Sequence, residues 1–344
     1  MPEGALFNAA VIGCGNIGRT HAGAFARHPR TRLVALADVR PEAAAALAGA
    51  YGVQASSCYQ DAAAMLAREA VDIVAVCTWP GLHAPMVVAA AEAGVKAIIC
   101  EKPFAPDLAQ ADEMLASCDK HGVKLIISHQ HRFNPYSVEA RRLIAAGAIG
   151  QPLLLHRQTV RGLLNNGSHM VDLGRYILGD PPWEWLLGQV QRDTDRYERG
   201  GRIEDVAVGL IGFAGGVRGL FEVDTPKPHE AEFKVYGSEA VLSFTTKELR
   251  LSSQEAPVAL NTEGFNVHIA QLDELIAWLE GGPAHRNDAH NNRHTLEILM
   301  GIYQSARRRT IVRPPLESGP SPLELMIDSG ELPVRIPGRV DLPI

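Results

Sequence analysis

The stretch VIGCGNIG, residues 11–18, decides the fold of the first part of the chain. Its three glycines have the spacing G-x-G-x-x-G, after an apolar run and before a helical pattern. In this context the first glycine permits a tight turn, the second lets the backbone approach a pyrophosphate, and the third allows close helix–strand packing. We therefore expect a βαβ unit that binds a dinucleotide rather than a bare glycine turn. The expected contacts come from Gly13, Gly15, Asn16, Ile17 and Gly18.

An acidic residue follows at the place where a second strand is expected to end. Asp38 closes the run VALAD, about 20 residues after the last glycine. A carboxylate there binds the adenosine ribose hydroxyls and repels a 2′-phosphate, which favours NAD over NADP. Arg40 stands two residues further on, and an arginine can accept a 2′-phosphate, so NADP remains the less favoured alternative.

Strand-like and helical patterns alternate up to residue 128 and then change character. The early strand runs are apolar throughout, with helices expected near 16–28, 41–50, 83–93 and 107–121, which predicts a doubly wound parallel Rossmann sheet. Later runs follow one another through short turns such as FAGGV, which predicts an α+β domain with a large, mostly antiparallel open sheet. Further helices are expected near 135–146, 265–281 and 292–308.

These patterns predict three parts of the chain. A dinucleotide-binding domain is expected over 1–128, and a substrate-binding and oligomerisation domain over 129–316. The remainder, 317–344, is rich in proline and is expected to be an extended arm.

Composition narrows the class of protein. The 344 residues are 46% hydrophobic and 21% charged, as in ordinary globular proteins, and the net charge of −6 offers no general attraction to nucleic acid or anionic membrane. No apolar run is long enough for a membrane span, and the first residues do not resemble a secretory signal. The five cysteines are irregularly spaced, so we expect reduced thiols and a cytoplasmic protein.

Two further stretches carry residues suited to catalysis. Glu101, Lys102 and Pro103 follow an apolar strand, at the sheet edge where open α/β folds bind ligands, so Lys102 would point at the nicotinamide, although taken alone it could equally be a solvated surface lysine. In NNGSHMVDL, His169 lies close to a helix start. Histidine titrates near neutral pH and can accept a hydroxyl proton, although it could instead cap or pack the helix.

Motifs along the chain resemble a known family. AVIGCGNIGRTH, CTWPGLH, CEKPF, HQHRFNP and NNGSHMVDL occur in that order, and the chain is similar over about 10–310 to the Gfo/Idh/MocA oxidoreductases, which include glucose–fructose oxidoreductase and inositol dehydrogenase. The resemblance implies a Rossmann domain, an α+β domain whose open sheet makes oligomer contacts, and hydride transfer on sugars or cyclitols.

The resemblance also implies roles for single residues. Relatives similar to inositol dehydrogenase carry D-x-x-x-H, in which the histidine is the acid/base, the aspartate orients it and a lysine completes the site. Here Lys102 and His169 match, but Asn165 takes the place of the aspartate and adds no charge to favour an imidazolium. Members acting on nucleotide-linked aminosugars look similar in having this asparagine.

Other expected contacts are less specific. Thr78, Trp79 and His83 match the family's cofactor segment T-P-x-x-x-H, with Trp79 replacing proline, and Glu101 adjoins the same site. Arg132 resembles an arginine near the substrate. The short loop before His169 lets Arg161 and Asn166 face a substrate, an acid or phosphate for Arg161, as an alternative to ordinary surface roles.

No metal site is expected. The histidines at 129 and 131 lack cysteine or carboxylate partners at suitable spacing, and those at 285, 290 and 294 fit a turn and a helix start. We therefore expect an NAD(P)-dependent oxidoreductase acting on a secondary hydroxyl or keto carbon of a sugar, cyclitol or nucleotide sugar. It is expected to be a homodimer or homotetramer joined through the C-terminal sheet. The alternative is a non-catalytic dinucleotide-binding regulator or sensor on the same scaffold.

Overall fold

The computed structural model describes residues 5–225 and 232–342, which pack into two compact units. The first unit contains the described residues of Met1–Ala105, Gln110–Gln130 and Asn266–Asn292. The second contains those of Pro106–Ala109, His131–Phe265 and Arg293–Ile344. Each unit has its own sheet and is described by itself. The two units are made of interleaved segments, in contrast to the continuous domains expected from the sequence.

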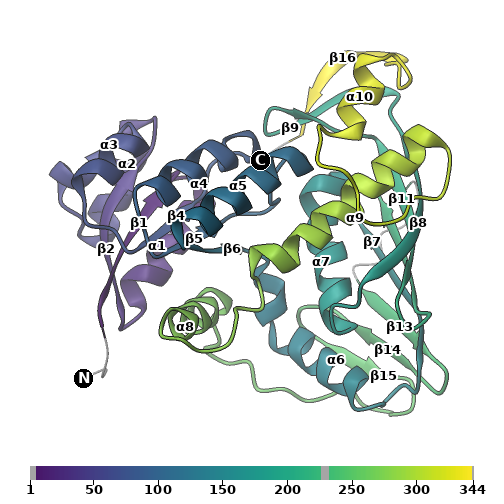
Figure 1. Ribbon diagram of the computed structural model, residues 1–344. Coiled ribbons are helices and arrows are strands. Elements are labelled where there is room, and N and C mark those ends of the chain that lie inside the picture. The colour runs from purple at the N-terminus through teal and green to yellow at the C-terminus, as the bar shows by residue number, and fades with distance from the viewer. Residues whose placement is uncertain (1–4, 226–231, 343–344) are drawn as a thin grey trace. The chain divides into compact units, whose positions relative to one another are not determined.

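A six-stranded parallel sheet forms the centre of the first unit (Figure 1). Its strand order, β3-β2-β1-β4-β5-β6, is that of a doubly wound dinucleotide-binding fold. The strands are all parallel, and the order in which they are added to the sheet reverses between β1 and β4. This confirms the predicted Rossmann sheet. The strands are β1 (Phe7–Ile12), β2 (Thr31–Ala37), β3 (Cys58–Tyr59), β4 (Ile73–Val76), β5 (Ala97–Cys100) and β6 (Lys124–Ile127).

Helices connect these strands, and one further helix, from a much later part of the sequence, packs in the same unit. Every residue of β4 and β5 is buried, as expected for central strands covered on both faces. Leu272, Leu275 and Ile276 of α8 belong to the same hydrophobic core as Phe25 of α1. The helices are α1 (Asn16–Arg27), α2 (Pro41–Tyr51), the short 3₁₀ helix η1 (Ala55–Ser57), α3 (Ala62–Arg68), η2 (Pro80–Leu82), α4 (His83–Glu92), α5 (Leu108–His121) and α8 (Val267–Leu279).

A seven-stranded sheet dominates the second unit. Its order is β15-β14-β13-β7-β12-β11-β8, and only the β7–β12 pair is parallel, which confirms the predicted mostly antiparallel sheet. The turn FAGGV joins β11 to β12 as an antiparallel hairpin. The strands are β7 (Pro152–Thr159), β8 (Trp183–Gln191), β11 (Val206–Phe213), β12 (Arg218–Val223), β13 (Phe233–Gly237), β14 (Val241–Phe244) and β15 (Leu249–Leu251).

One face of this sheet packs against helices. A side chain at Gly174 of α7 would collide with Phe221 of β12, and one at Gly188 of β8 would collide with Ile302 of α9, so the helices lie close to the strands. On the opposite face, Leu187 and Tyr236 are exposed. The sheet is therefore open on one side. The helices of this unit are the 3₁₀ helix η3 (Gln130–Phe133), α6 (Pro135–Ala145), α7 (Ser168–Ile177), α9 (Ala289–Arg308) and α10 (Pro322–Asp328).

The C-terminal segment is more ordered than the extended arm that was expected. Pro322 occupies the first turn of the helix α10, where a missing N–H costs nothing, so proline starts a helix here instead of preventing one. Beyond it, β16 (Ile336–Asp341) pairs in parallel with β9 (Thr194–Glu198), and β9 pairs with β10 (Gly201–Arg202). Within the described ranges, no helix is long and apolar enough to cross a membrane.

Candidate active site

The glycine loop has the geometry expected of a phosphate cradle. Gly13 has φ +93°, and a Cβ there would lie 2.7 Å from the carbonyl oxygen of Cys77. A Cβ at Gly18 would collide with the carbonyl of Gly13, so both positions require glycine to avoid clashes with the protein's own backbone. A Cβ at Gly15 would meet nothing within 4 Å among the described atoms. The space in front of Gly15, at the start of α1, fits a pyrophosphate that approaches the backbone.

Asp38 is fixed beside this loop at the end of β2. Its carboxylate accepts hydrogen bonds from the backbone N–H of Cys14 at 2.7 Å and of Arg40 at 2.9 Å. The exposed guanidinium of Arg40 lies 3.7 Å from the same carboxylate. Each carboxylate oxygen therefore keeps a lone pair for a ribose hydroxyl, while Arg40 partly offsets the charge that would repel a 2′-phosphate.

His83 joins the loops that follow β4 and β5. The ring is fully buried, with Nδ1 3.0 Å from the carbonyl oxygen of Pro103 and Nε2 3.1 Å from that of Thr78. Burial lowers the pKa of His83, so the neutral ring donates to one of these carbonyls. His83 thus links the loop after β4 to the loop after β5 through these two carbonyl groups. Trp79 is half exposed, and the buried hydroxyl of Thr78 has no hydrogen-bond partner in the described residues.

Glu101 forms a buried ion pair next to Lys102. Its Oε1 lies 2.7 Å from Nε2 of His21, and its Oε2 accepts from the backbone N–H of Lys102 at 3.2 Å. Burial opposes ionisation of Glu101. The hydrogen bond and charge of His21, the charge of Lys102 and a hydrogen bond from Ser128 outweigh it and bring the Glu101 pKa to about 2. The carboxylate is therefore charged at neutral pH and anchors the turn that presents Lys102 at the end of β5.

In the second unit, the segment before His169 is a π-helical turn, η4 (Gly162–Gly167), where a loop was expected. Carboxylates bind its first N–H groups. Asp224 accepts from Arg161 at 3.0 Å and from Gly162 at 2.8 Å. Glu204 accepts from Leu163 at 2.6 Å. A π-helical turn inside or beside an α-helix is frequent at functional sites, and here charged groups hold it in place.

His169 lies at the start of α7, directly after this turn, and is partly buried. The ring of His131 meets it edge to face, with 4.6 Å between the ring centroids. Asn165 is buried, and its side-chain N–H donates to Glu198 of β9. The position that carries aspartate in the family pattern is thus occupied by an amide bound to a carboxylate.

Arg132, which was expected near the substrate, forms ion pairs with two carboxylates of the second unit. Its side chain is fully buried, and it donates to Asp172 from Nε at 2.8 Å and from Nη2 at 2.7 Å. Asp180 lies 2.9 Å from Nη2 as well. Although burial disfavours the charge, these two carboxylates raise the Arg132 pKa above its ordinary value. The guanidinium is used to hold α7, the helix that carries His169.

Arg161 and Asn166 lie at the two ends of η4. Arg161 is exposed with φ +70°, a left-handed conformation uncommon outside glycine, and Asp224 holds its backbone. Within the described residues no side-chain partner is found for either residue. Both side chains are therefore available to a ligand.

The histidines weighed as metal ligands have other partners. His285 Nε2 lies 3.2 Å from the carbonyl oxygen of Gln271, and His290 lies 3.0 Å from Asp119. His294 lies 3.6 Å from Glu297. The described residues contain no group of three or more histidine, cysteine, aspartate or glutamate side chains placed to hold a metal.

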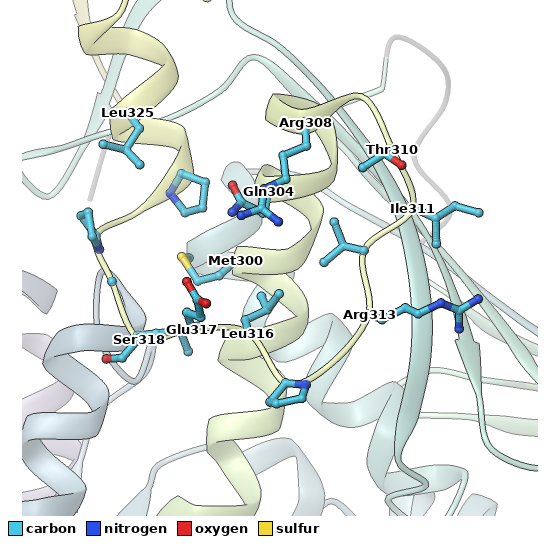
Figure 2. Close-up of a pocket in the computed structure, with 16 residues that line it drawn as sticks. Met300, Gln304, Arg308, Thr310, Ile311, Arg313, Leu316, Glu317, Ser318 and Leu325 are labelled. Carbon is cyan, nitrogen blue, oxygen red and sulfur yellow. The ribbon is translucent and has the colours of Figure 1, made fainter.

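A separate cavity of about 500 Å³ lies in the second unit, between α9 and the C-terminal segment (Figure 2). Gln304 and Arg308 reach towards it from α9, and Leu325 of α10 lies across from them. It contains none of the residues predicted for the active site.

Sequence comparison covers both units. Residues 7–129 match a model described as an oxidoreductase family with an NAD-binding Rossmann fold, and residues 158–243 match a GFO/IDH/MocA C-terminal domain. The D-apiose dehydrogenase of Paraburkholderia graminis is 29% identical over 91% of both chains. The uncharacterized oxidoreductase YrbE of Bacillus subtilis is 32% identical over 74% of this chain and 76% of its own.

Comparison of structures gives the same fold. The WlbA dehydrogenase of Bordetella pertussis, solved in complex with NADH and UDP-GlcNAcA, superposes with a TM-score of 0.77 at 23% identity, covering 92% of this chain and all (100%) of the other. The arrangement of a Rossmann sheet with a second, mostly antiparallel sheet is therefore shared with this dehydrogenase.

Proposed function

The chain belongs to the Gfo/Idh/MocA family of NAD-binding oxidoreductases, and we propose that it is a dehydrogenase acting on a secondary hydroxyl or keto carbon of a sugar, cyclitol or nucleotide sugar. The observation that carries the proposal is that the same chain contains a glycine loop with open space at Gly15, a lysine at the end of β5 (Lys102) and a histidine at the start of α7 (His169). A regulator or sensor would need the cradle alone. Relatives named as dehydrogenases, such as the D-apiose enzyme, also favour catalysis.

The proposed mechanism divides the work among few residues. When bound, NAD supplies the nicotinamide that accepts hydride from the substrate carbon. His169 accepts the hydroxyl proton during oxidation and returns it during reduction. The Lys102 ammonium donates a hydrogen bond to the developing alkoxide. Asn165 holds the segment that carries His169, through its bond to Glu198.

The cofactor would be held by the cradle and by the loops after β2, β4 and β5. The backbone of the glycine loop would bind the pyrophosphate, and Asp38 the ribose hydroxyls, which is why NAD is proposed over NADP. Arg40 could stabilise a 2′-phosphate but is paired with Asp38. Trp79 and Thr78 would contact the cofactor, while His83 and Glu101 would hold the loops that do so.

The substrate would meet the two ends of η4. Arg161 offers an exposed guanidinium that suits a carboxylate or phosphate, and Asn166 offers an amide for a hydroxyl. Nucleotide-linked or acidic sugars are thus proposed ahead of free inositols. The presence of UDP-GlcNAcA in the related WlbA structure supports this choice.

Two further properties belong to the proposal. The exposed apolar residues Leu187 and Tyr236 on the open sheet face favour a homodimer or homotetramer through that sheet.

All five cysteines are free, which favours a reducing compartment such as the cytoplasm.

A coupled substrate screen tests the proposed function. Purified protein would be offered NAD or NADP with inositols, aldoses, sugar acids and UDP-sugars while reduced nicotinamide is followed by absorbance. We expect turnover with NAD, and losses of at least about 100-fold in kcat/KM for Lys102→Ala and His169→Ala, because each removes a group used in the transition state.

Matched controls separate catalysis from general damage. Lys120→Ala and His121→Ala change an exposed lysine and an exposed histidine on α5 and should keep full activity. Turnover that survives His169→Ala would remove this histidine as the proton acceptor. Tight NAD binding without turnover on any substrate would favour the sensor instead.

A further inference from the structure

The side-chain amide of Asn165 is hydrogen-bonded to a carboxylate that is far from it in the sequence. The Asn165 side chain donates to Oε1 of Glu198, which stands 33 residues away along the chain. Both side chains belong to residues that are 8% exposed. A carboxyl group is therefore present one hydrogen bond beyond the position at which the family pattern carries aspartate.

A tight hairpin turn between β9 and β10 directly follows Glu198. This residue is the buried end of β9, whereas the other residues of that strand are only partly buried. Arg199 and Gly200 follow with φ of +47° and +80°, and the chain returns as β10. Two successive left-handed residues make the tight hairpin turn whose twist suits paired strands. For Arg199 this conformation is costly, and uncommon backbone conformations concentrate at functional sites.

The C-terminal segment holds both strands of this hairpin. β16 pairs with β9 in a register that sets Asp341 opposite Tyr197, the neighbour of Glu198. Arg202 of β10 forms ion pairs with Glu324 and with Asp328 of α10, the latter at 2.8 Å. The strand that ends at Glu198 is thus fixed by the helix and the strand of the C-terminal segment.

We propose that Glu198 is a positioning residue that supplies, through Asn165, the negative charge that the N-x-x-x-H pattern lacks. The inference rests on the proposed function, in which His169 accepts the substrate proton. A buried carboxylate is weakly screened and favours the protonated form of a nearby imidazole. Glu198 therefore raises the pH at which His169 exchanges its proton, and Asn165 keeps the carboxylate at a fixed place.

Other charged groups surround the same segment and must be held constant in a test. They are His131, Arg161, Asp172, Arg196, Glu204 and Asp224. Asp172 is neutralised by Arg132, and Asp224 lies 3.6 Å from Arg196. Glu204 is buried under the first turn of η4, where burial raises its pKa. Among these carboxylates, Glu198 is the partner of the Asn165 side chain.

Titration of His169 by NMR tests the proposal without a substrate. The full-length protein would be labelled with ¹³C at the imidazole carbons, and the His169 signal would be assigned with His169→Gln. We expect Glu198→Gln to lower the titration midpoint of His169 by about 1 pH unit, because a buried negative charge is lost. Glutamine keeps the shape and an acceptor for Asn165, so the hydrogen bond survives.

Two further variants make the test specific. Asp195→Asn removes a carboxylate from the same strand, one that is paired with Arg192, and should leave the midpoint unchanged. The double variant Asn165→Asp with Glu198→Gln exchanges the amide and the carboxylate and should restore the wild-type midpoint. An unchanged midpoint in Glu198→Gln, or an equal fall in Asp195→Asn, would overturn the role of Glu198. Neither outcome depends on turnover, so failure of the proposed function is recognised separately in the substrate screen.

Discussion

At the scale of single residues, the proposed preference for NAD over NADP rests on Asp38. Replacing Asp38 with alanine would remove the proposed acceptor for the ribose hydroxyls and the charge that would repel a 2′-phosphate, while the Arg40 guanidinium, which lies 3.7 Å from the Asp38 carboxylate, would remain. We expect Asp38→Ala to lower kcat/KM with NAD by about 10- to 100-fold and to raise relative use of NADP. Activity with each cofactor would be compared under equal conditions. Asp61→Ala, which changes a helix-capping aspartate, is the control. An unchanged preference would remove Asp38 as the selecting residue.

The residues that could be predicted from sequence are those whose function follows from local spacing. Gly13 and Gly18 are required by the turn and helix that they join, so their pattern is visible in a short window. Arg132 could not be placed in this way, because its role depends on Asp172 and Asp180, which fold against it from 40 and 48 residues away. Glu198 has no local signal at all.

At the scale of elements, strands and helices with strong periodicity were predictable, whereas η4 and α10 were not. β1, α1 and β2 follow from apolar runs and glycines. The turn η4 was expected to be a loop. Its π-helical form could not be predicted, because it depends on Asp224 and Glu204, which lie close to the ends of β12 and β11, far from η4 in the sequence. Likewise, α10 was not expected in a proline-rich segment, although proline at the first turn is compatible with a helix.

The hydrogen bonds from the first N–H groups of η4 to Asp224 should stabilise this turn measurably. Asp224→Ala removes the acceptor of two backbone N–H groups, at Arg161 and Gly162, and buried or partly buried donors are costly to leave without partners. We expect the amides of η4 to exchange with deuterium about 10-fold faster or more, with the core of the seven-stranded sheet unaffected. Asp195→Asn is the control. Equal protection of η4 in both variants would show that the carboxylate does not hold the turn.

At the scale of the whole molecule, the division of the chain was only partly visible in the sequence. The two sheets were predicted because the pattern of strands changes after about residue 130. The inclusion of α8 in the first unit was not, because its periodicity says that it is a helix with an apolar face but not which core receives that face. A long-range packing choice of this kind has no local signature.

The open face of the seven-stranded sheet carries the last prediction. Leu187 is 48% exposed at the centre of β8, with Leu210 opposite it on β11, and a second copy would cover such a surface. We expect the wild type to be a homodimer or homotetramer in light scattering, and Leu187→Asp to reduce the assembly to a smaller species, since a buried charge is costly. Leu6→Asp changes a leucine that is 53% exposed in the first unit and should keep the wild-type mass. A monomeric wild type, or an assembly unaffected by Leu187→Asp, would show that this face is not the interface.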